Sequence, residues 1–180
     1  MVEQLARNIG PSKIDMAYDC FGDRNNPPVL LIMGLGGQMI AWHEDFIQLL
    51  VDRGLYVVRF DNRDAGLSTH FHESPMPDMP AVLAGDYSTV SYTLSDMAAD
   101  TVGLMDFLNL DTAHVVGASL GGYIAQTLAI EYPDRIRSLT SMMATTGDMS
   151  LGQPDPETMK IFRLQPPTNR NEAMDNAIAA

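Results

Sequence analysis

Short runs of apolar residues alternate with amphipathic segments along most of this 180-residue chain. The run PPVLLIM (27–33) is continuous, begins at prolines and ends at a glycine, as in a strand buried on both faces of a sheet. The segment KIDMAYDCFG (13–22) instead alternates apolar and polar residues, which suits an edge strand or a hairpin. The same continuous pattern predicts further buried strands at 55–61, 113–119 and 136–144.

Segments with helical spacing separate these strands. Residues 41–54 place apolar side chains every three or four positions, and residues 121–133 form another amphipathic run. Residues 92–110 contain Thr93 and Asp96, which form a capping-box pair at the start of a helix. Because strands and helices alternate, the sequence predicts an α/β fold class with a mostly parallel sheet and helices on both faces.

The pattern changes character at residue 147. Residues 147–180 are polar and interrupted by prolines, with short helical pieces. We therefore expect residues 1–146 to form the N-terminal part of the core and residues 147–180 to begin a lid or cap. The chain ends within a helical run that has no stop signal, so we expect the fold to be incomplete at its C-terminus.

Composition and charge narrow the class of protein. Hydrophobic residues make up 46% of the chain and charged residues 19%, which is typical of a globular protein. A net charge of −12 repels phosphate backbones, so nucleic acid is not expected as a partner. The single cysteine, Cys20, excludes an intrachain disulfide, and no segment matches a signal peptide or a membrane span. We expect a cytoplasmic protein without a membrane partner.

The candidate chemistry lies in HVVGASLGG (114–122), where a serine sits at the junction of a predicted strand and a predicted helix. Gly117, Ser119 and Gly121 fit the pattern G-x-S-x-G. A sharp turn of this kind exposes the serine hydroxyl at the carboxyl end of a sheet, and glycines avoid collisions with the neighbouring backbone. The following helix N-terminus favours negative charge there. Ser119 is therefore a candidate nucleophile; the alternative is a glycine turn shaped only by packing.

A second glycine-rich loop, IMGLGGQ (32–38), follows the first continuous apolar strand. Acyl transfer requires two backbone amides that bind the oxyanion, and we expect them from Leu35 and from Leu120, while Gly34 lets the loop approach the substrate. The loop fits neither a phosphate loop nor a dinucleotide loop, because both the following residues and the glycine spacing differ. Three apolar residues are candidates for a substrate pocket, with core packing as the alternative: Met33, Met39 and Trp42.

These motifs resemble those of the N-terminal part of an α/β-hydrolase. The resemblance covers about residues 14–146 and rests on the glycine loop, on FDNRDAGLS (60–68) and on the GASLGG turn. Within the superfamily the chain is most similar to bacterial carboxylesterases of the aclacinomycin methylesterase type. Two positions depart from the usual pattern: Asp64 stands where glycine is usual, and Met33 precedes Gly34 where many relatives have histidine. The resemblance implies the α/β-hydrolase fold and a serine nucleophile.

A serine nucleophile requires a histidine and an acid, and the resemblance places both after the nucleophile. All four histidines precede Ser119 in the chain. His114 is expected to be structural, and His43 is either a packing or surface residue of a helix or a pocket residue. His70 and His72 form an H-x-H pair that would need further ligands to bind a metal, so no metal site is expected.

The sequence does not identify the acid. Asp148 follows the last predicted strand, where a few family members carry their acid and most begin a lid. Asp61 and Arg63 are instead expected to fix their own loop through charged hydrogen bonds.

The sequence therefore predicts a hydrolase of small-molecule carboxylic esters that forms an acyl-enzyme at Ser119 and needs no cofactor. We expect an acid and a histidine beyond residue 180 to complete the triad, from the remaining C-terminal portion of the same hydrolase in the same or a cleaved chain. Two alternatives stay open. One is another serine-dependent activity, such as carbon–carbon bond hydrolysis or perhydrolysis. The other is a non-catalytic binding protein or an inactive fragment on the same fold.

Overall fold

The chain divides into two compact units, Met1–Thr146 and Gly147–Ala180. The computed structural model describes residues 4–148, 151–152, 155, 169–171 and 174. The first unit contains the whole sheet. The second unit lies largely outside the described residues, so its expected role as the start of a lid stays a prediction.

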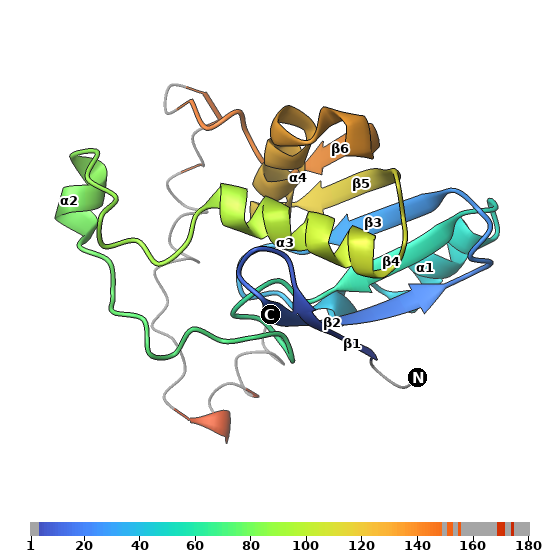
Figure 1. The fold of residues 1–180 in the computed structure, drawn as a ribbon, viewed down its shortest axis with the longest axis horizontal. Helices are drawn as coiled ribbons and strands as arrows, with labels where there is room; N and C mark the ends of the chain where they lie inside the picture. Colours follow the sequence, from blue (N-terminus) through green and yellow to red (C-terminus); the bar gives the residue numbers. More distant parts are fainter. Residues whose placement is uncertain (1–3, 149–150, 153–154, 156–168, 172–173, 175–180) are drawn as a thin grey trace. The chain divides into compact units, whose positions relative to one another are not determined.

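One six-stranded sheet is built from β1 (Gln4–Ile9), β2 (Ile14–Phe21), β3 (Pro28–Ile32), β4 (Tyr56–Phe60), β5 (Ala113–Ala118) and β6 (Ile136–Met142). The strand order is β1-β2-β4-β3-β5-β6 (Figure 1). Strand β3 pairs in parallel with β4 and β5, and β5 pairs in parallel with β6. Strands β1 and β2 form an antiparallel hairpin, and β2 is also antiparallel to β4. The mostly parallel sheet predicted from the sequence is confirmed.

The strand predicted at residues 13–22 is part of a hairpin and lies inside the sheet, with β1 at the edge. The sequence pattern did not reveal β1. Its pairing register with β2 shifts between Ala6 and Ile9, so the two-residue alternation of buried and exposed side chains is interrupted. Both of these residues are nevertheless buried.

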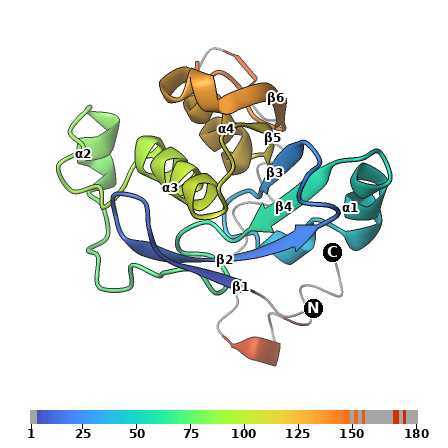
Figure 2. The same cartoon turned by 45° about the vertical axis from the view of Figure 1, so that its right-hand side comes forward.

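Helices cover both faces of the sheet, as predicted. The longer ones are α1 (Glu44–Val51), α3 (Leu94–Phe107) and α4 (Leu120–Glu131). Figure 2 shows α3 and α4 on one face and α1 on the other. Shorter helical segments are α2 (Met79–Leu83) and the 3-10 turns η1 (Met39–Ala41) and η2 (Pro133–Arg135). No helix among the described residues is long and apolar enough to cross a lipid bilayer.

The side chains of strand β3 contribute to two hydrophobic clusters, one on each face of the sheet. Leu30 and Ile32 belong to the cluster that includes residues of α3 and α4, whereas Val29 and Leu31 belong to the cluster that includes Ile47 of α1. Because successive side chains of a strand point to opposite faces, a continuous apolar run fills both layers. Full burial of each such side chain contributes about 1.5–3 kcal/mol to folding.

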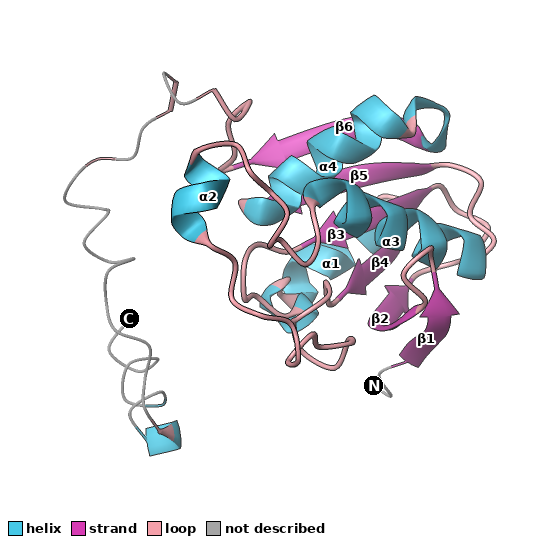
Figure 3. Cartoon of the chain, turned by 60° about the vertical axis from the view of Figure 1, so that its left-hand side comes forward, coloured by secondary structure: helices cyan, strands magenta, loops and turns pink. Residues whose placement is uncertain are grey.

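The starts of two helices differ in how well the sequence predicts them. Helix α3 begins after Thr93, which exchanges capping hydrogen bonds with Asp96 as predicted. Helix α1 begins at Glu44 and not at residue 41, because His43 is its N-cap and accepts a hydrogen bond from the Asp45 N–H over 3.3 Å. Figure 3 also shows α2, a short helix that was not predicted from the sequence.

Candidate active site

Ser119 lies on the sharp turn between β5 and α4. Its backbone angles, φ 54° and ψ −119°, belong to a conformation that costs a residue other than glycine about 1–3 kcal/mol. The Ser119 N–H donates to the Met142 carbonyl on β6 over 2.8 Å, and the Gly122 N–H donates to the Ser119 carbonyl over 2.8 Å. Ser119 is exposed, and its hydroxyl has no hydrogen-bond partner among the described residues. The turn therefore presents an unengaged hydroxyl at the N-terminus of α4.

The two motif glycines lie in direct contact with backbone atoms. A Cβ atom at Gly117 would lie 2.0 Å from the carbonyl oxygen of Gly121. A Cβ atom at Gly121 would lie 2.1 Å from the carbonyl oxygen of Ile32, at the end of β3. Since atoms do not approach this closely without bonding, the turn requires glycine at both positions unless the backbone shifts.

The glycine loop after β3 lies beside the serine. A Cβ atom at Gly34 would lie 3.0 Å from Ser119 Cβ and 3.5 Å from Ser119 Oγ. The Gly37 N–H donates to the Gly34 carbonyl over 3.1 Å and closes a turn around Leu35. The Leu35 amide has no acceptor among the described residues, and neither has that of Leu120 in the first turn of α4. Two unpaired amides thus belong to the segments that meet at Ser119.

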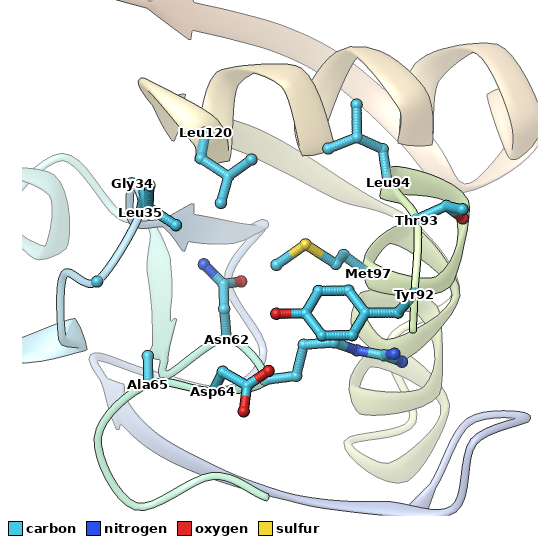
Figure 4. A pocket seen from close by; sticks show the side chains of 12 residues that line it. Gly34, Leu35, Asn62, Asp64, Ala65, Tyr92, Thr93, Leu94, Met97 and Leu120 are labelled. Atoms are coloured by element: carbon cyan, nitrogen blue, oxygen red, sulfur yellow. The ribbon is translucent and has the colours of Figure 1, made fainter. Parts of the chain in front are cut away.

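A cavity of about 250 Å³ is lined by Gly34, Leu35 and Leu120 at this place (Figure 4). The rest of its wall comes from two regions of the fold. Leu94 and Met97 of α3 supply apolar surface. Polar groups come from the loop after β4 and from the residue before the α3 cap: Asn62, Asp64 and Tyr92.

The three residues predicted for a substrate pocket do not line this cavity. Met39 is 1% exposed and Trp42 is 7% exposed, and Trp42 belongs to the core cluster that includes Ile47. Met33 is half-buried and packs against the same cluster. Trp42 lies outside α1, at the end of the 3-10 turn η1, and its ring stacks on that of Phe46 with the centroids 5.7 Å apart.

Comparison with known proteins identifies the family to which this arrangement belongs. Residues 27–176 match the family model described as the alpha/beta hydrolase fold. The chain belongs to the alpha/beta hydrolase family. Its mostly parallel sheet with flanking helices is the fold that the family model describes.

Relatives of this alpha/beta hydrolase chain have different named activities. The chain is 32% identical over 143 residues to the rhodomycin D methylesterase DnrP of Streptomyces peucetius, covering 79% of the chain and 43% of that protein. It is 27% identical to the enol-lactonase of Burkholderia xenovorans LB400, with a TM-score of 0.57, covering 74% of the chain and 44% of the lactonase. Epoxide Hydrolase A of Mycobacterium thermoresistibile is 26% identical, with a TM-score of 0.57, covering 75% of the chain and 36% of that protein. The match to DnrP confirms the resemblance to methylesterases. The chain spans less than half the length of each of these three relatives.

Within this hydrolase chain, Asp61 fixes two loops at once. Its Oδ1 accepts a hydrogen bond from the Met39 N–H over 2.6 Å, and its Oδ2 accepts one from the Leu67 N–H over 3.0 Å. The contact with Leu67 confirms the predicted role of Asp61 in its own loop. The contact with Met39 adds a link to the segment after the glycine loop, which the sequence pattern did not indicate.

Arg63 lies 5.2 Å from the centre of the Phe71 ring in its own loop, but none of its hydrogen bonds among the described residues goes to that loop, so the predicted charged hydrogen bonds were wrong. Its Nε donates to Asp100 Oδ2 on α3 over 2.7 Å, and its Nη2 donates to Ser12 Oγ over 3.1 Å. The Arg63 and Asp100 side chains are 2% and 1% exposed. Burial raises the pKa of the Asp100 carboxyl, and the Arg63 guanidinium opposes that shift. A buried guanidinium needs a buried acceptor, and the carboxylate of α3 supplies one.

The four histidines make their contacts away from Ser119. His43 caps α1, and the rings of His70 and His72 stack with their centroids 4.9 Å apart. His114 lies at the start of β5, whereas Ser119 follows the end of that strand. Within the part of the chain that the structure describes, no three or more metal-ligating side chains form a cluster.

Two polar residues of the cavity wall, Asn62 and Tyr92, were not predicted from the sequence. A signal was available for Asn62, because it follows the end of β4 and the carboxyl ends of parallel strands meet at the edge where ligands bind. Tyr92 is brought to the same cavity by the start of α3, and no local pattern indicates that placement.

Proposed function

We propose that this chain carries the nucleophile of a serine hydrolase that acts on carboxylic esters. The observation behind the proposal is the exposed, unpartnered Ser119 hydroxyl at the N-terminus of α4, where Leu35 and Leu120 offer unpaired amides beside a cavity. Ser119 Oγ attacks the acyl carbon, and these two amides donate hydrogen bonds to the oxyanion. The alcohol leaves with a proton. Water then attacks the acyl-enzyme, which releases the acid and returns the serine hydroxyl.

The histidine and acid of the triad are placed beyond residue 180 in this proposal. The four histidines are held by other contacts, and the aligned region spans 43% of the length of DnrP. Among the described residues β6 pairs only with β5, so the backbone groups on its outer edge can pair with another strand. The side chains at its interior positions are exposed as well.

Two observations favour ester cleavage over other reactions: the residue at the turn is a serine, Ser119, and two relatives are named for activities on esters. The names of DnrP and of the lactonase both refer to ester bonds. Epoxide opening on this fold needs an aspartate as nucleophile, and this chain has Ser119 at that position. Carbon–carbon bond hydrolysis and perhydrolysis use the same serine, and ester turnover in the test below separates them from the proposed reaction.

The test combines covalent labelling with turnover in the protein that carries this chain. A fluorophosphonate probe is expected to label Ser119, because its Oγ attacks phosphorus and fluoride leaves. Ser119→Ala should abolish both the label and the hydrolysis of p-nitrophenyl esters. Ser88→Ala, at an exposed serine outside the cavity lining, should retain both. Peptide mapping by mass spectrometry locates the label.

Three outcomes would contradict the proposal. The label could be carried by another residue, or Ser119→Ala could retain esterase activity. Failure of the folded wild-type protein to take the label at all would favour a non-catalytic binding protein on the same fold.

A further inference from the structure

The cavity beside Ser119 has a wall of hydrogen-bond acceptors, and Asn62 is the first of them. Asn62 Nδ2 donates to the Met33 carbonyl over 2.9 Å. Because a carbonyl oxygen can only accept, this bond fixes the orientation of the amide and leaves Oδ1 on the cavity side (Figure 4). No described residue donates a hydrogen bond to this oxygen.

Asp64 is the second acceptor and the only one that carries a negative charge. It adopts a left-handed backbone conformation, φ 61°, which glycine would adopt at lower cost. The loop holds it there, since the Asp64 N–H donates to the Thr69 carbonyl over 3.0 Å and Asp64 Oδ1 accepts from the Phe71 N–H over 2.7 Å. A carboxylate has about four acceptor positions, so most of its capacity remains. Its side chain is 33% exposed and lines the cavity.

Tyr92 completes the wall. Its hydroxyl points into the cavity, on the side where Asn62 and Asp64 lie (Figure 4). Burial, together with the neighbouring Asp64 carboxylate, raises the pKa of Tyr92 to about 12. The phenol therefore stays protonated at neutral pH, when its oxygen can accept a hydrogen bond from a ligand.

Two cationic side chains lie at this wall: Arg63, which also lines the cavity, and His70. The Arg63 guanidinium is bonded to Asp100, and it lies 4.8 Å from the centre of the Tyr92 ring. His70 Nδ1 lies 4.0 Å from Asp64 Oδ1, and its Nε2 lies 3.1 Å from the Gly66 carbonyl oxygen. Arg63 and Asp100 compensate each other, so the charge that the wall offers to a ligand is that of Asp64.

We propose that Asn62, Asp64 and Tyr92 form a subsite for an ammonium group on the substrate, so that the enzyme prefers esters carrying a primary amine near the scissile bond. The inference rests on the proposed ester hydrolysis at Ser119. An ammonium group has three hydrogen-bond donors and one positive charge. These match the three acceptor residues of the subsite, one of which, Asp64, is a negatively charged carboxylate. A carboxylate-bearing ester would be repelled by Asp64 and would leave the acceptors unpaired. The subsite thus selects substrates by charge and by hydrogen-bond donors.

The test compares two esters of nearly the same shape, methyl 4-(aminomethyl)benzoate and methyl 4-ethylbenzoate, at about pH 8. The ratio of their kcat/KM values is measured in the protein that carries this chain. We expect the ammonium ester to be preferred about tenfold or more. Asp64→Asn should lower this ratio about tenfold, since it keeps an acceptor for Phe71 and removes the charge. Asp64→Gly removes the side chain without backbone strain and should lower the ratio as well.

Asp111→Asn is the matched control. It removes the same charge at an exposed position just before β5, at the opposite end of that strand from Ser119, and should leave the ratio unchanged. An equal fall of the ratio in this variant would mean that net charge and not the subsite sets the preference, which overturns the inference. Equal kcat/KM values for the two esters in the wild type would also overturn it, while the esterase proposal would stand. Hydrolysis of neither ester by a protein that turns over p-nitrophenyl esters would overturn the inference alone.

Discussion

At the residue scale, the geometry of Ser119 depends on glycines that leave room for backbone. Gly121→Ala would place a Cβ atom 2.1 Å from the Ile32 carbonyl oxygen, which forces β3 and α4 apart. We expect a loss of about 3 kcal/mol or more in the free energy of unfolding, measured by urea denaturation of the protein that carries this chain. Labelling of Ser119 should fall in parallel, because the turn that presents its hydroxyl is displaced.

Gly54→Ala is the control for this prediction. Gly54 also has a positive φ, 77°, but no atom lies within 4 Å of a Cβ atom built there. The substitution should cost only the left-handed backbone strain, about 1–2 kcal/mol. If Gly121→Ala were as mild as Gly54→Ala, the close packing of the turn would not be what requires glycine.

The same scale shows which site residues a sequence can predict. Gly117 and Gly121 are predictable because a short motif encodes the steric requirement of one turn. The sequence around Met39 and Trp42 fits a pocket residue and a core residue equally well. Both side chains are buried in the fold, and Trp42 packs in the core cluster that includes Ile47 of α1. The place of Asn62 after β4 is a signal that the sequence carries, whereas the orientation of its side chain depends on a carbonyl that is distant in the chain.

At the scale of elements, one buried ion pair connects the loop after β4 to helix α3. Arg63→Met would leave the Asp100 carboxylate buried without its partner, and Asp100 Oδ1 already has no hydrogen-bond partner among the described residues. We expect the free energy of unfolding to fall by about 3–5 kcal/mol in urea denaturation. The double variant Arg63→Met/Asp100→Leu removes both charges and should recover most of this loss. A double variant no more stable than Arg63→Met would show that the pair contributes through Arg63 packing alone.

Helices and strands were predicted well where their own residues include a capping pair or a regular pattern of apolar side chains. The Thr93–Asp96 capping box located the start of α3 within the sequence. Strand β1 was not predictable because its pairing with the neighbouring β2 is irregular. The partner of Arg63 was not predictable because it is a carboxylate of α3, far away in the chain. Propensity and periodicity describe neither kind of contact.

At the scale of the whole molecule, β6 forms one edge of the sheet in the part of the chain that the structure describes. Interior residues of β6 are exposed, Leu139 among them at 40%, although β6 is parallel to β5 and parallel strands are normally covered on both sides. The proposed triad also needs a histidine that none of the described contacts brings to Ser119. Both observations support the proposal that further chain completes the sheet and the catalytic site.

The intact mass of the protein purified from its natural source, measured under denaturing conditions, tests that proposal. The 180 residues alone have a mass of 19.7 kDa. We expect either one species near about 30 kDa or a second species of about 10 kDa that co-purifies with the first, since the rest of such a domain is on the order of a hundred residues. A lone 19.7 kDa species that hydrolyses esters would contradict the proposed triad, because the histidine would then have to come from within these residues. A lone 19.7 kDa species without activity would favour the binding protein or inactive fragment, since Ser119 would lack the base that removes its proton.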